Sequence, residues 1–270
     1  MLLTELERFI DEDIGYNDIS NSIVPDCKVR AEVIAKEDGI VAGLAESAQV
    51  FEYFDVLSTT DLADGSSLKK NDVLFSIDGD ARSILRAERL ALNFLGRMSG
   101  IATMTRKYVE RAGNVRIACT RKTTPGFRKF EKKAVIAGGG DPHRFNLSDA
   151  VMIKDNHIAV LGLEKAVKKA KGMASFTQKI EVEVETIDDA IRAAELGVDI
   201  IMFDNMTVDK IKESIISITK KGLHEGIILE ASGGISLENI AEYASSGVDV
   251  ISVGALTHSS RWLDISMGVK

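Results

Sequence analysis

The sequence has little of what marks secreted or membrane-spanning proteins. Its 270 residues contain only two cysteines, Cys27 and Cys119, and neither belongs to a Cys-x-x-Cys pair, which leaves no support for a zinc knuckle or a disulfide framework. No apolar run approaches the roughly 20 residues of a membrane-spanning helix. The acidic N-terminal segment MLLTELERFIDEDIG does not have the basic and then apolar order of a signal peptide. We therefore expect a reduced, cytoplasmic protein.

Net positive charge is also lacking, but the charge is unevenly distributed. The chain has 34 Lys and Arg residues against 41 Asp and Glu residues, a net charge of −7, and aromatic residues make up 6%. This balance argues against nucleic acids and anionic membranes as partners. Residues 116–154 nevertheless carry nine basic and three acidic residues (+6), which leaves −13 (25 basic, 38 acidic) for the rest. A basic segment in an acidic protein indicates a confined anionic ligand.

The first hundred residues predict a mixed α and β structure. Hydrophobic residues are 45% and charged residues 28% of the chain, as in ordinary globular proteins of one or two domains. Apolar spacing predicts helices at 2–11, 44–54 and 81–108 and strands at 29–36 and within 64–80. Gly96 and Gly100 either interrupt the last of these helices or allow another segment to approach it closely.

The second half predicts parallel strands that alternate with helices. The apolar, β-rich runs lie at 115–119, 150–154, 179–184, 199–203, 226–231 and 249–254. Amphipathic helical patterns separate the later runs, which is typical of parallel βα units. Six strands, or seven, indicate a closed or nearly closed β/α barrel, and a doubly wound open sheet is the alternative.

Carboxylates occur where two of these strands end. Strand 179–184 places Glu181, Glu183 and Glu185 on one face. Because helices cover the outside of a parallel barrel, we expect this face to point inward, near the carboxyl ends of the strands. Asp204 follows strand 199–203 directly, where it could contact a metal ion or ribose hydroxyls, or equally cap a helix.

Two glycine turns follow the last two predicted strands. Ser232, Gly233 and Gly234 come after one, and Gly254 stands at the end of the other. Backbone N–H groups in such turns, together with a helix N-terminus, form phosphate sites at late barrel strands.

Eight of the nine Lys and Arg residues of segment 116–154, together with His143, fall into two groups. One group lies next to strand ends and predicts a cationic pocket for a ligand with more than one carboxylate or phosphate. Its members are Arg121, Lys122, His143, Arg144 and Lys154. The other group fits a solvated helical face and comprises Arg128, Lys129, Lys132 and Lys133. His157 is interpreted as structural or as a support for a site residue, and His258 is interpreted as structural.

Eight segments in order make the chain recognisable. They are EDIGYNDIS (12–20), AERLALNFLGRMSGIAT (87–103), TRKTTPGFRKFEKKAV (120–135), GGGDPHRFNLSDAVMIKDNH (138–157), EVEVET (181–186), MFDNM (202–206), LEASGGI (229–235) and VISVGALTHSSRWLDISM (250–267). With these motifs the sequence resembles the quinolinate phosphoribosyltransferases, also called carboxylating nicotinate-nucleotide pyrophosphorylases, over nearly its whole length.

The resemblance implies a two-domain α/β protein. It implies an N-terminal open α/β sandwich domain at 1–104, on which 258–270 packs back, and a C-terminal six- to seven-stranded α/β barrel at 105–257. It also implies a homodimer with shared active sites, or a higher oligomer. The implied reaction converts quinolinate and phosphoribosyl pyrophosphate to nicotinate mononucleotide, pyrophosphate and CO₂ with Mg²⁺, on the de novo route to NAD.

The resemblance also implies roles for individual residues. Quinolinate would be bound by Arg121, His143, Arg144 and Lys154, with Arg89 reaching in from the partner subunit. Lys122 would face the phosphoribosyl group. Glu183 and Asp204 would bind the ribose hydroxyls and Mg²⁺. They would also stabilise the positive charge that develops on the ribose. The 5′-phosphate cradle would consist of Ser232, Gly233, Gly234 and Gly254.

Three alternatives remain at this point. A nicotinate phosphoribosyltransferase would bind a monocarboxylate, and the number of cations at strand ends favours a dicarboxylate. A molybdenum-associated paralogue shares the fold, but the segment Lys154-Asp155-Asn156-His157 favours the quinolinate enzymes. A non-catalytic phosphate-binding barrel would not need Glu183, Asp204 and Lys154 together.

Overall fold

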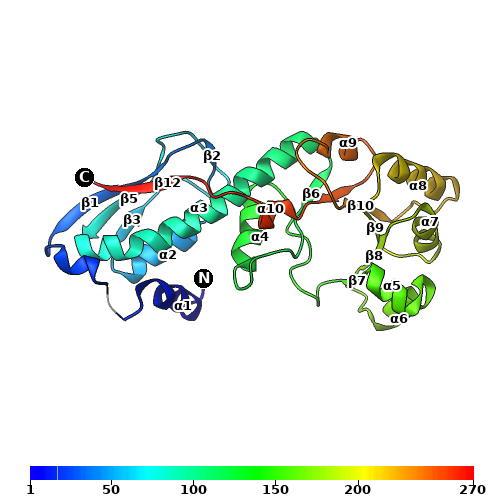
Figure 1. Ribbon diagram of the computed structural model, residues 1–270, viewed down its shortest axis with the longest axis horizontal. Coiled ribbons are helices and arrows are strands. Elements are labelled where there is room, and N and C mark those ends of the chain that lie inside the picture. Colours follow the sequence, from blue (N-terminus) through cyan, green and yellow to red (C-terminus); the bar gives the residue numbers. More distant parts are fainter. Residues whose placement is uncertain (17) are drawn as a thin grey trace. The chain divides into compact units, whose positions relative to one another are not determined.

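The computed structural model describes residues 1–16 and 18–270 and divides the chain into two compact units (Figure 1). Unit 1 comprises Met1–Met104, Lys129–Gly139 and Ser260–Lys270, and unit 2 comprises Thr105–Arg128 and Gly140–Ser259. Each unit is therefore assembled from segments that are distant in the sequence. Part of the motif at 12–20 lies outside the described residues, because it includes Asn17.

Unit 1 is built on a four-stranded antiparallel sheet with the order β12-β1-β5-β3. Figure 1 shows β12, from the C-terminal end of the chain, beside β1 from the N-terminal region, and Ala31 pairs with Val269 there. Phe9, Phe94 and Phe130 form a cluster of edge-to-face aromatic contacts in the core of the unit. The strands are β1 (Lys28–Ala35), β3 (Leu57–Thr59), β5 (Val73–Asp80) and β12 (Ile265–Val269), with a separate pair of β2 (Gly39–Ile40) and β4 (Ser67–Leu68).

The helices of this part of the chain agree with the apolar spacing. They are α1 (Leu3–Ile14), the 3-10 helix Ser20–Ile23, α2 (Leu44–Tyr53), α3 (Ala81–Ala112) and α4 (Arg128–Ala137). Helix α3 is continuous, so an interruption at Gly96 or Gly100 is wrong and the close approach is confirmed. A Cβ atom at Gly100 would lie 2.0 Å from the backbone oxygen of Arg261, and one at Gly96 would lie 3.2 Å from that of Leu263.

Replacement of Gly100 by alanine is expected to lower the free energy of unfolding by about 3 kcal/mol, because the backbone must move to relieve the overlap. Gly172→Ala, in the last turn of α6 (Leu163–Met173), is the matched control, since nothing lies within 4 Å of its added Cβ. It should stabilise the helix by up to about 1 kcal/mol. Urea unfolding followed by circular dichroism measures both, and equal effects would contradict the close approach of the C-terminal segment.

Helix α4 does not present the solvated cationic face that its sequence predicts. Lys132 is only 2% exposed, and Glu131 is fully buried. Arg97 donates a hydrogen bond to Glu131 at 2.6 Å, and Lys129 pairs with Glu5 at 2.9 Å. The prediction is wrong for Lys132, because the helix packs into unit 1 and its neighbouring charges are matched by carboxylates distant in the sequence.

Unit 2 contains a six-stranded parallel sheet with the order β6-β11-β10-β9-β8-β7. From β7 to β11 each strand pairs with the next in the chain, and β11 pairs with β6, the first. This is the strand order of a barrel, and it has no reversal of the kind found in a doubly wound sheet. The strands are β6 (Arg116–Ala118), β7 (Val151–Ile153), β8 (Ile180–Val184), β9 (Ile200–Asp204), β10 (Ile228–Ser232) and β11 (Val250–Ser252).

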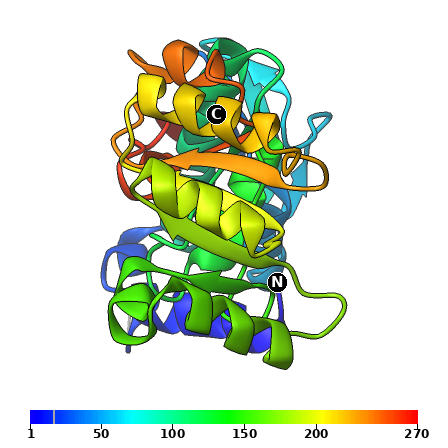
Figure 2. The same ribbon diagram turned by 90° about the vertical axis from the view of Figure 1, so that its right-hand side faces the viewer.

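Helices lie on the outer face of this sheet, as Figure 2 shows for the yellow-green and yellow segments. The helices that follow the strands of this unit are α5 (Asp155–Leu161), α6, α7 (Ile187–Glu195), α8 (Val208–Lys220), α9 (Ile240–Ala244) and α10 (Ala255–His258). A single parallel bridge joins Ala118 of β6 to Asp141 on the other side of that strand. The segment at Asp141 thus occupies the position of a rudimentary seventh strand. Within the described residues, no helix is long and apolar enough to cross a membrane.

Candidate active site

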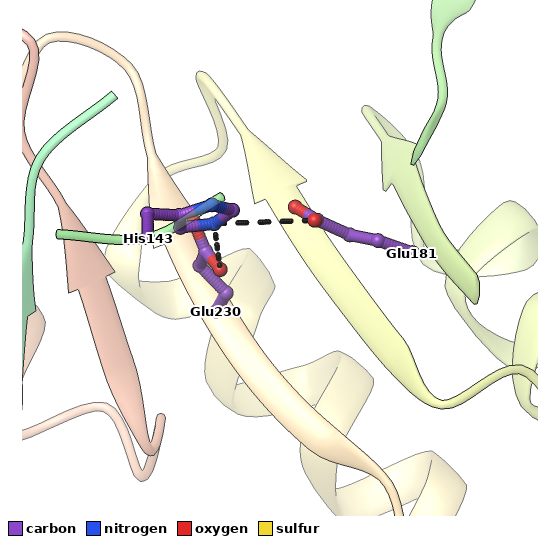
Figure 3. A group of neighbouring side chains, drawn as sticks. All are labelled: His143, Glu181 and Glu230. Carbon is purple, nitrogen blue, oxygen red and sulfur yellow. Dashed lines mark hydrogen bonds and ion pairs between the residues drawn. The ribbon is translucent and has the colours of Figure 1, made fainter. Parts of the chain in front are cut away.

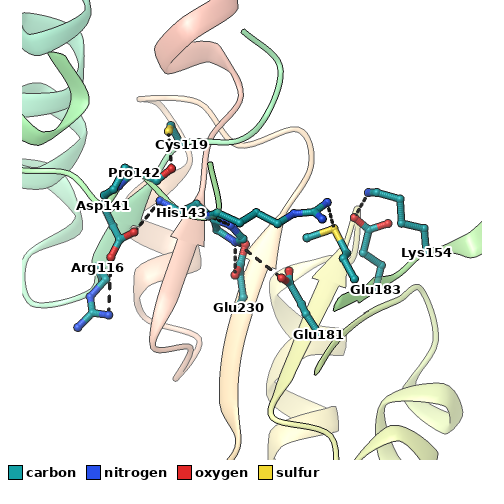
Figure 4. Close-up of polar contacts among 11 residues, drawn as sticks. Arg116, Cys119, Asp141, Pro142, His143, Lys154, Glu181, Glu183 and Glu230 are labelled. Carbon is teal, nitrogen blue, oxygen red and sulfur yellow. Dashed lines mark hydrogen bonds and ion pairs between the residues drawn. The ribbon is translucent and has the colours of Figure 1, made fainter. Parts of the chain in front are cut away.

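A cavity of about 440 Å³ lies at the carboxyl ends of the strands of unit 2. Figure 4 shows His143, Lys154 and Glu183 from its lining. Because the strands are parallel, the side chains that follow each of them meet at this edge. The cavity brings together all five basic residues predicted at strand ends, with Glu183, Asp204 and Ser232. Its lining is Cys119, Thr120, Arg121, Lys122, His143, Arg144, Met152, Lys154, Asp155, Glu183, Met202, Asp204, Ser232 and Ser252.

Two arginines in this cavity have no acidic partner among the described residues. The Nε of Arg121 is buried and has no hydrogen-bond partner. The guanidinium of Arg144 lies 2.9 Å from the sulfur of Met152, a weak acceptor. Burial lowers the pKa of Arg144, and the positive charge of Arg121 adds to this effect while Glu181 opposes it. An anion with two binding groups would satisfy both arginines.

The remaining charged groups form a second part of the cavity. Lys154 forms an ion pair with Glu183, whose side chain comes from β8. Asp204, at the end of β9, is half-buried and has no side-chain partner in the described part of the chain. His157 caps α5, because its Nδ1 accepts a hydrogen bond from the backbone N–H of Lys154 at 3.0 Å. This contact supports a structural role for His157.

The predicted glycine turns lie beside these side chains. Gly233 has φ +89°, and a Cβ there would come within 2.3 Å of Asn205 Oδ1, so only glycine allows this approach of β10 to the end of β9. A Cβ at Gly254 would lie 3.2 Å from Lys122 Cδ, which places Lys122 beside the turn after β11. Helix α9 begins only at Ile240, so no α-helix starts directly at Gly234, whose φ is +63°.

One predicted residue lies elsewhere. Arg89 is exposed on α3 in unit 1 and does not line the cavity.

The turn that carries Arg144 has an unusual backbone. His143 has φ +52°, in the left-handed region, which non-glycine residues rarely adopt. Its N–H donates to Asp141 Oδ1 at 2.7 Å, and its ring Nδ1 accepts from the N–H of Arg144 at 2.8 Å. With Nδ1 acting as acceptor, the neutral ring carries its proton on Nε2. Nε2 faces Glu230 Oε2 at 3.3 Å (Figure 3).

Two buried glutamates lie below this turn. Glu181 from β8 and Glu230 from β10 are 0% and 2% exposed, and they line a second cavity of about 360 Å³ with His143 and Arg144. Burial, with the charge of Glu230, raises the pKa of Glu181 to about 8. The inward direction predicted for Glu181 and Glu183 is confirmed, whereas Glu185 is exposed. Glu230 is not among the predicted residues, although a charged residue inside the apolar run 226–231 marks it.

Two sets of residues could hold a cation. Glu183 and Asp204 offer carboxylate oxygens beside the cationic pocket, and Mg²⁺ is bound in this way by one or two carboxylates together with substrate phosphates. These residues fit the predicted metal. The ligand atoms of His143, Glu181 and Glu230 also lie within 4.8 Å of one another.

Comparisons with known proteins identify the family. The C-terminal domain of quinolinate phosphoribosyl transferase matches residues 101–268, and the N-terminal domain matches residues 17–99. The chain is 48% identical to the probable nicotinate-nucleotide pyrophosphorylase (carboxylating) of Archaeoglobus fulgidus over 94% of this chain and 98% of that protein. It is 45% identical to the protein of the same name from Bacillus subtilis over 98% and 92% of the two chains.

Solved structures agree with this assignment. The crystal structure of NadC from Streptococcus pyogenes is 42% identical, covers 99% of this chain and 95% of its own, and has a TM-score of 0.93. The resemblance of the eight sequence motifs and the predicted α/β fold class are thereby confirmed. The chain belongs to the quinolinate phosphoribosyltransferase family.

Proposed function

We propose that this protein is a carboxylating nicotinate-nucleotide pyrophosphorylase. It would convert quinolinate and phosphoribosyl pyrophosphate to nicotinate mononucleotide, pyrophosphate and CO₂ in NAD biosynthesis. The observation that carries the proposal is the pair Arg121 and Arg144, which share one cavity without an acidic partner in the described residues. Quinolinate has two adjacent carboxylates, and each can take a bidentate guanidinium contact.

The other charged groups suit the phosphoribosyl partner. Glu183 and Asp204 would bind the ribose hydroxyls and hold Mg²⁺, which when bound offsets the charge of the pyrophosphate. Lys122 lies beside Gly254, where a cation suits a phosphate group. Ser232 lines the same cavity, and Gly233 keeps the backbone of its turn close to Asn205. We assign the 5′-phosphate to this turn and to the turn at Gly254.

The proposed chemistry proceeds in two steps. The ring nitrogen of quinolinate attacks C1′ of the ribose as the bond from C1′ to pyrophosphate breaks. Glu183 and Asp204 would stabilise the positive charge that develops on the ribose. The C2 carboxylate then leaves as CO₂, the adjacent positive pyridinium nitrogen stabilises the electron pair that remains on C2, and a proton adds to that pair. The arginines hold the ring in position for both steps.

Substrate discrimination tests the proposal. Pyrophosphate release is measured with phosphoribosyl pyrophosphate, Mg²⁺ and either quinolinate or nicotinate. Nicotinate has one carboxylate and would leave part of the buried cationic site unpaired. The kcat/KM for quinolinate should therefore be at least about 100-fold higher than that for nicotinate. Equal or better turnover of nicotinate would identify a nicotinate phosphoribosyltransferase instead, and binding of phosphoribosyl pyrophosphate without turnover would indicate a non-catalytic barrel.

We also propose that the protein acts in the cytoplasm as a homodimer in which the partner subunit's Arg89 completes each site. The exposure of Arg89 in unit 1 leaves it available for this role. Arg89→Ala and Arg144→Ala variants, each with low activity, should regain activity when unfolded together, mixed and refolded, because one site of each mixed dimer is then intact. No recovery, with mixed dimers verified by tagged subunits, would contradict the shared site.

A further inference from the structure

The turn at residues 141–144 is held in a strained conformation by anchors on two strands. A non-glycine residue at φ +52° costs roughly 1 kcal/mol or more and persists only where its surroundings fix it. On one side the backbone of Asp141 is fixed to β6. Its N–H donates a hydrogen bond to the backbone oxygen of Ile117 at 2.7 Å, and its backbone oxygen accepts one from the N–H of Cys119 at 3.0 Å. The carboxylate of Asp141 then holds the N–H of His143.

The second anchor comes from β10. The imidazole of His143 bridges two groups, because its Nδ1 accepts a hydrogen bond from the backbone N–H of Arg144. On its other side, Nε2 faces the carboxylate of Glu230 (Figures 3 and 4). Glu230 therefore restrains the ring, and the ring restrains the backbone of the residue that carries the guanidinium. This chain of contacts runs from the barrel interior to the proposed substrate site.

Glu230 makes no comparable contact elsewhere in the described part of the chain. Its Oε1 is buried without a hydrogen-bond partner, and both oxygens of neighbouring Glu181 are in the same state. Glu181 Oε2 lies 3.9 Å from His143 Nε2, beyond hydrogen-bond distance. Burying two adjacent carboxyl groups destabilises a fold relative to apolar side chains. The contact that explains a glutamate at position 230 is the one with His143.

We propose that Glu230 is a positioning residue that sets the affinity for quinolinate by holding the His143–Arg144 turn from the barrel interior. The inference rests on the proposed function, because it takes Arg144 to bind a substrate carboxylate. Glu230 itself does not touch the substrate. Loss of this anchor should release Arg144 and leave the phosphoribosyl side unchanged. That side is built from the ends of β8, β9 and β10 and the turn at Gly254, and Ser232 at the end of β10 keeps its pairing with β9 and β11.

The test compares Glu230→Gln with Glu230→Met. The Gln oxygen can accept the proton of His143 Nε2, whereas Met has similar length and no such acceptor. For Glu230→Met we expect the Kd for quinolinate, measured by calorimetry, to rise at least about tenfold. This factor corresponds to the loss of one hydrogen bond to a charged group. The KM for phosphoribosyl pyrophosphate, measured by pyrophosphate release, should stay within about twofold, and Glu230→Gln should restore most of the quinolinate affinity.

Glu181→Met is the matched control, since it removes an equally buried carboxyl group that makes no hydrogen bond. Its effect on the Kd for quinolinate should be under about threefold. If Glu230→Met does not fold, Asp141→Ala, which removes the other anchor of the same turn, should show the same increase in Kd.

Four outcomes would overturn the inference. They are equal effects of Met at positions 181 and 230, no rescue by Gln, an equal rise in the KM for phosphoribosyl pyrophosphate, and a stoichiometric metal ion that is lost in Glu230→Gln. A wild-type protein that binds quinolinate without turnover would refute the proposed function, and the binding comparison would still decide the role of Glu230.

Discussion

Arg144→Ala is expected to raise the Kd for quinolinate about 100-fold, because a charge-assisted contact of about 3 kcal/mol with a carboxylate is lost. Within the described residues the guanidinium has a thioether as its only side-chain partner, so its removal leaves no carboxylate of the protein unpaired. The loss should therefore appear in substrate binding, with little change in the free energy of unfolding. Calorimetry with quinolinate and urea unfolding measure the two quantities.

One further variant separates the charge of this side chain from its geometry, and another controls for the loss of a positive charge elsewhere. Arg144→Lys keeps the charge but not the planar fork, and we expect an intermediate loss of affinity. Arg192→Ala on α7 is the control, because it removes a positive charge whose ion pairs within the described residues lie on the surface. An equal fall in affinity for phosphoribosyl pyrophosphate and quinolinate in Arg144→Ala would contradict the division of the cavity into two parts.

Asp204→Asn is expected to lower kcat by about 10²- to 10³-fold, the range found when a preorganised group that stabilises transition-state charge is removed. The substitution keeps the size of a side chain that has no partner in the described structure, so the fold should be retained. The Kd for quinolinate should change little, because the arginines bind it. A higher concentration of Mg²⁺ should be needed for half-maximal rate.

Asp209→Asn serves as the control for that variant. Asp209 lies in the first turn of α8, where it is exposed and outside the cavity. Its replacement by Asn removes one negative charge from the same unit. Steady-state rates over a range of Mg²⁺ concentrations measure both proteins. A normal kcat in Asp204→Asn together with a raised Kd for quinolinate would contradict this prediction, because it would show that Asp204 contributes to quinolinate binding and not to the phosphoribosyl step.

Strand positions and the residues that follow them could be predicted from the sequence, because both depend on local patterns. Each of the six apolar runs overlaps a strand. Arg121 and Lys154 follow strand ends as predicted, Asp204 is the last residue of its strand, and Arg144 lies in the turn after the bridge residue Asp141. Parallel packing alone brings such residues to one edge, which is why the cationic pocket emerges from spacing.

Contacts between segments far apart in the chain could not be predicted in this way. The burial of Lys132 depends on how α4 packs in unit 1, and Lys129 is matched by Glu5, more than a hundred residues away. Glu230 acquires its role only through His143, which reaches it by a left-handed backbone conformation. The spacing of residues in the sequence predicts neither the packing of α4 nor the contact between Glu230 and His143.

The direct test of the proposed reaction is the fate of the C2 carboxylate. Quinolinate labelled with ¹⁴C at that carboxyl group is incubated with the protein, phosphoribosyl pyrophosphate and Mg²⁺. We expect labelled CO₂ and nicotinate mononucleotide to form in equal amounts and only when phosphoribosyl pyrophosphate is present. Ribosylation of a pyridine ring without release of labelled CO₂ would contradict it.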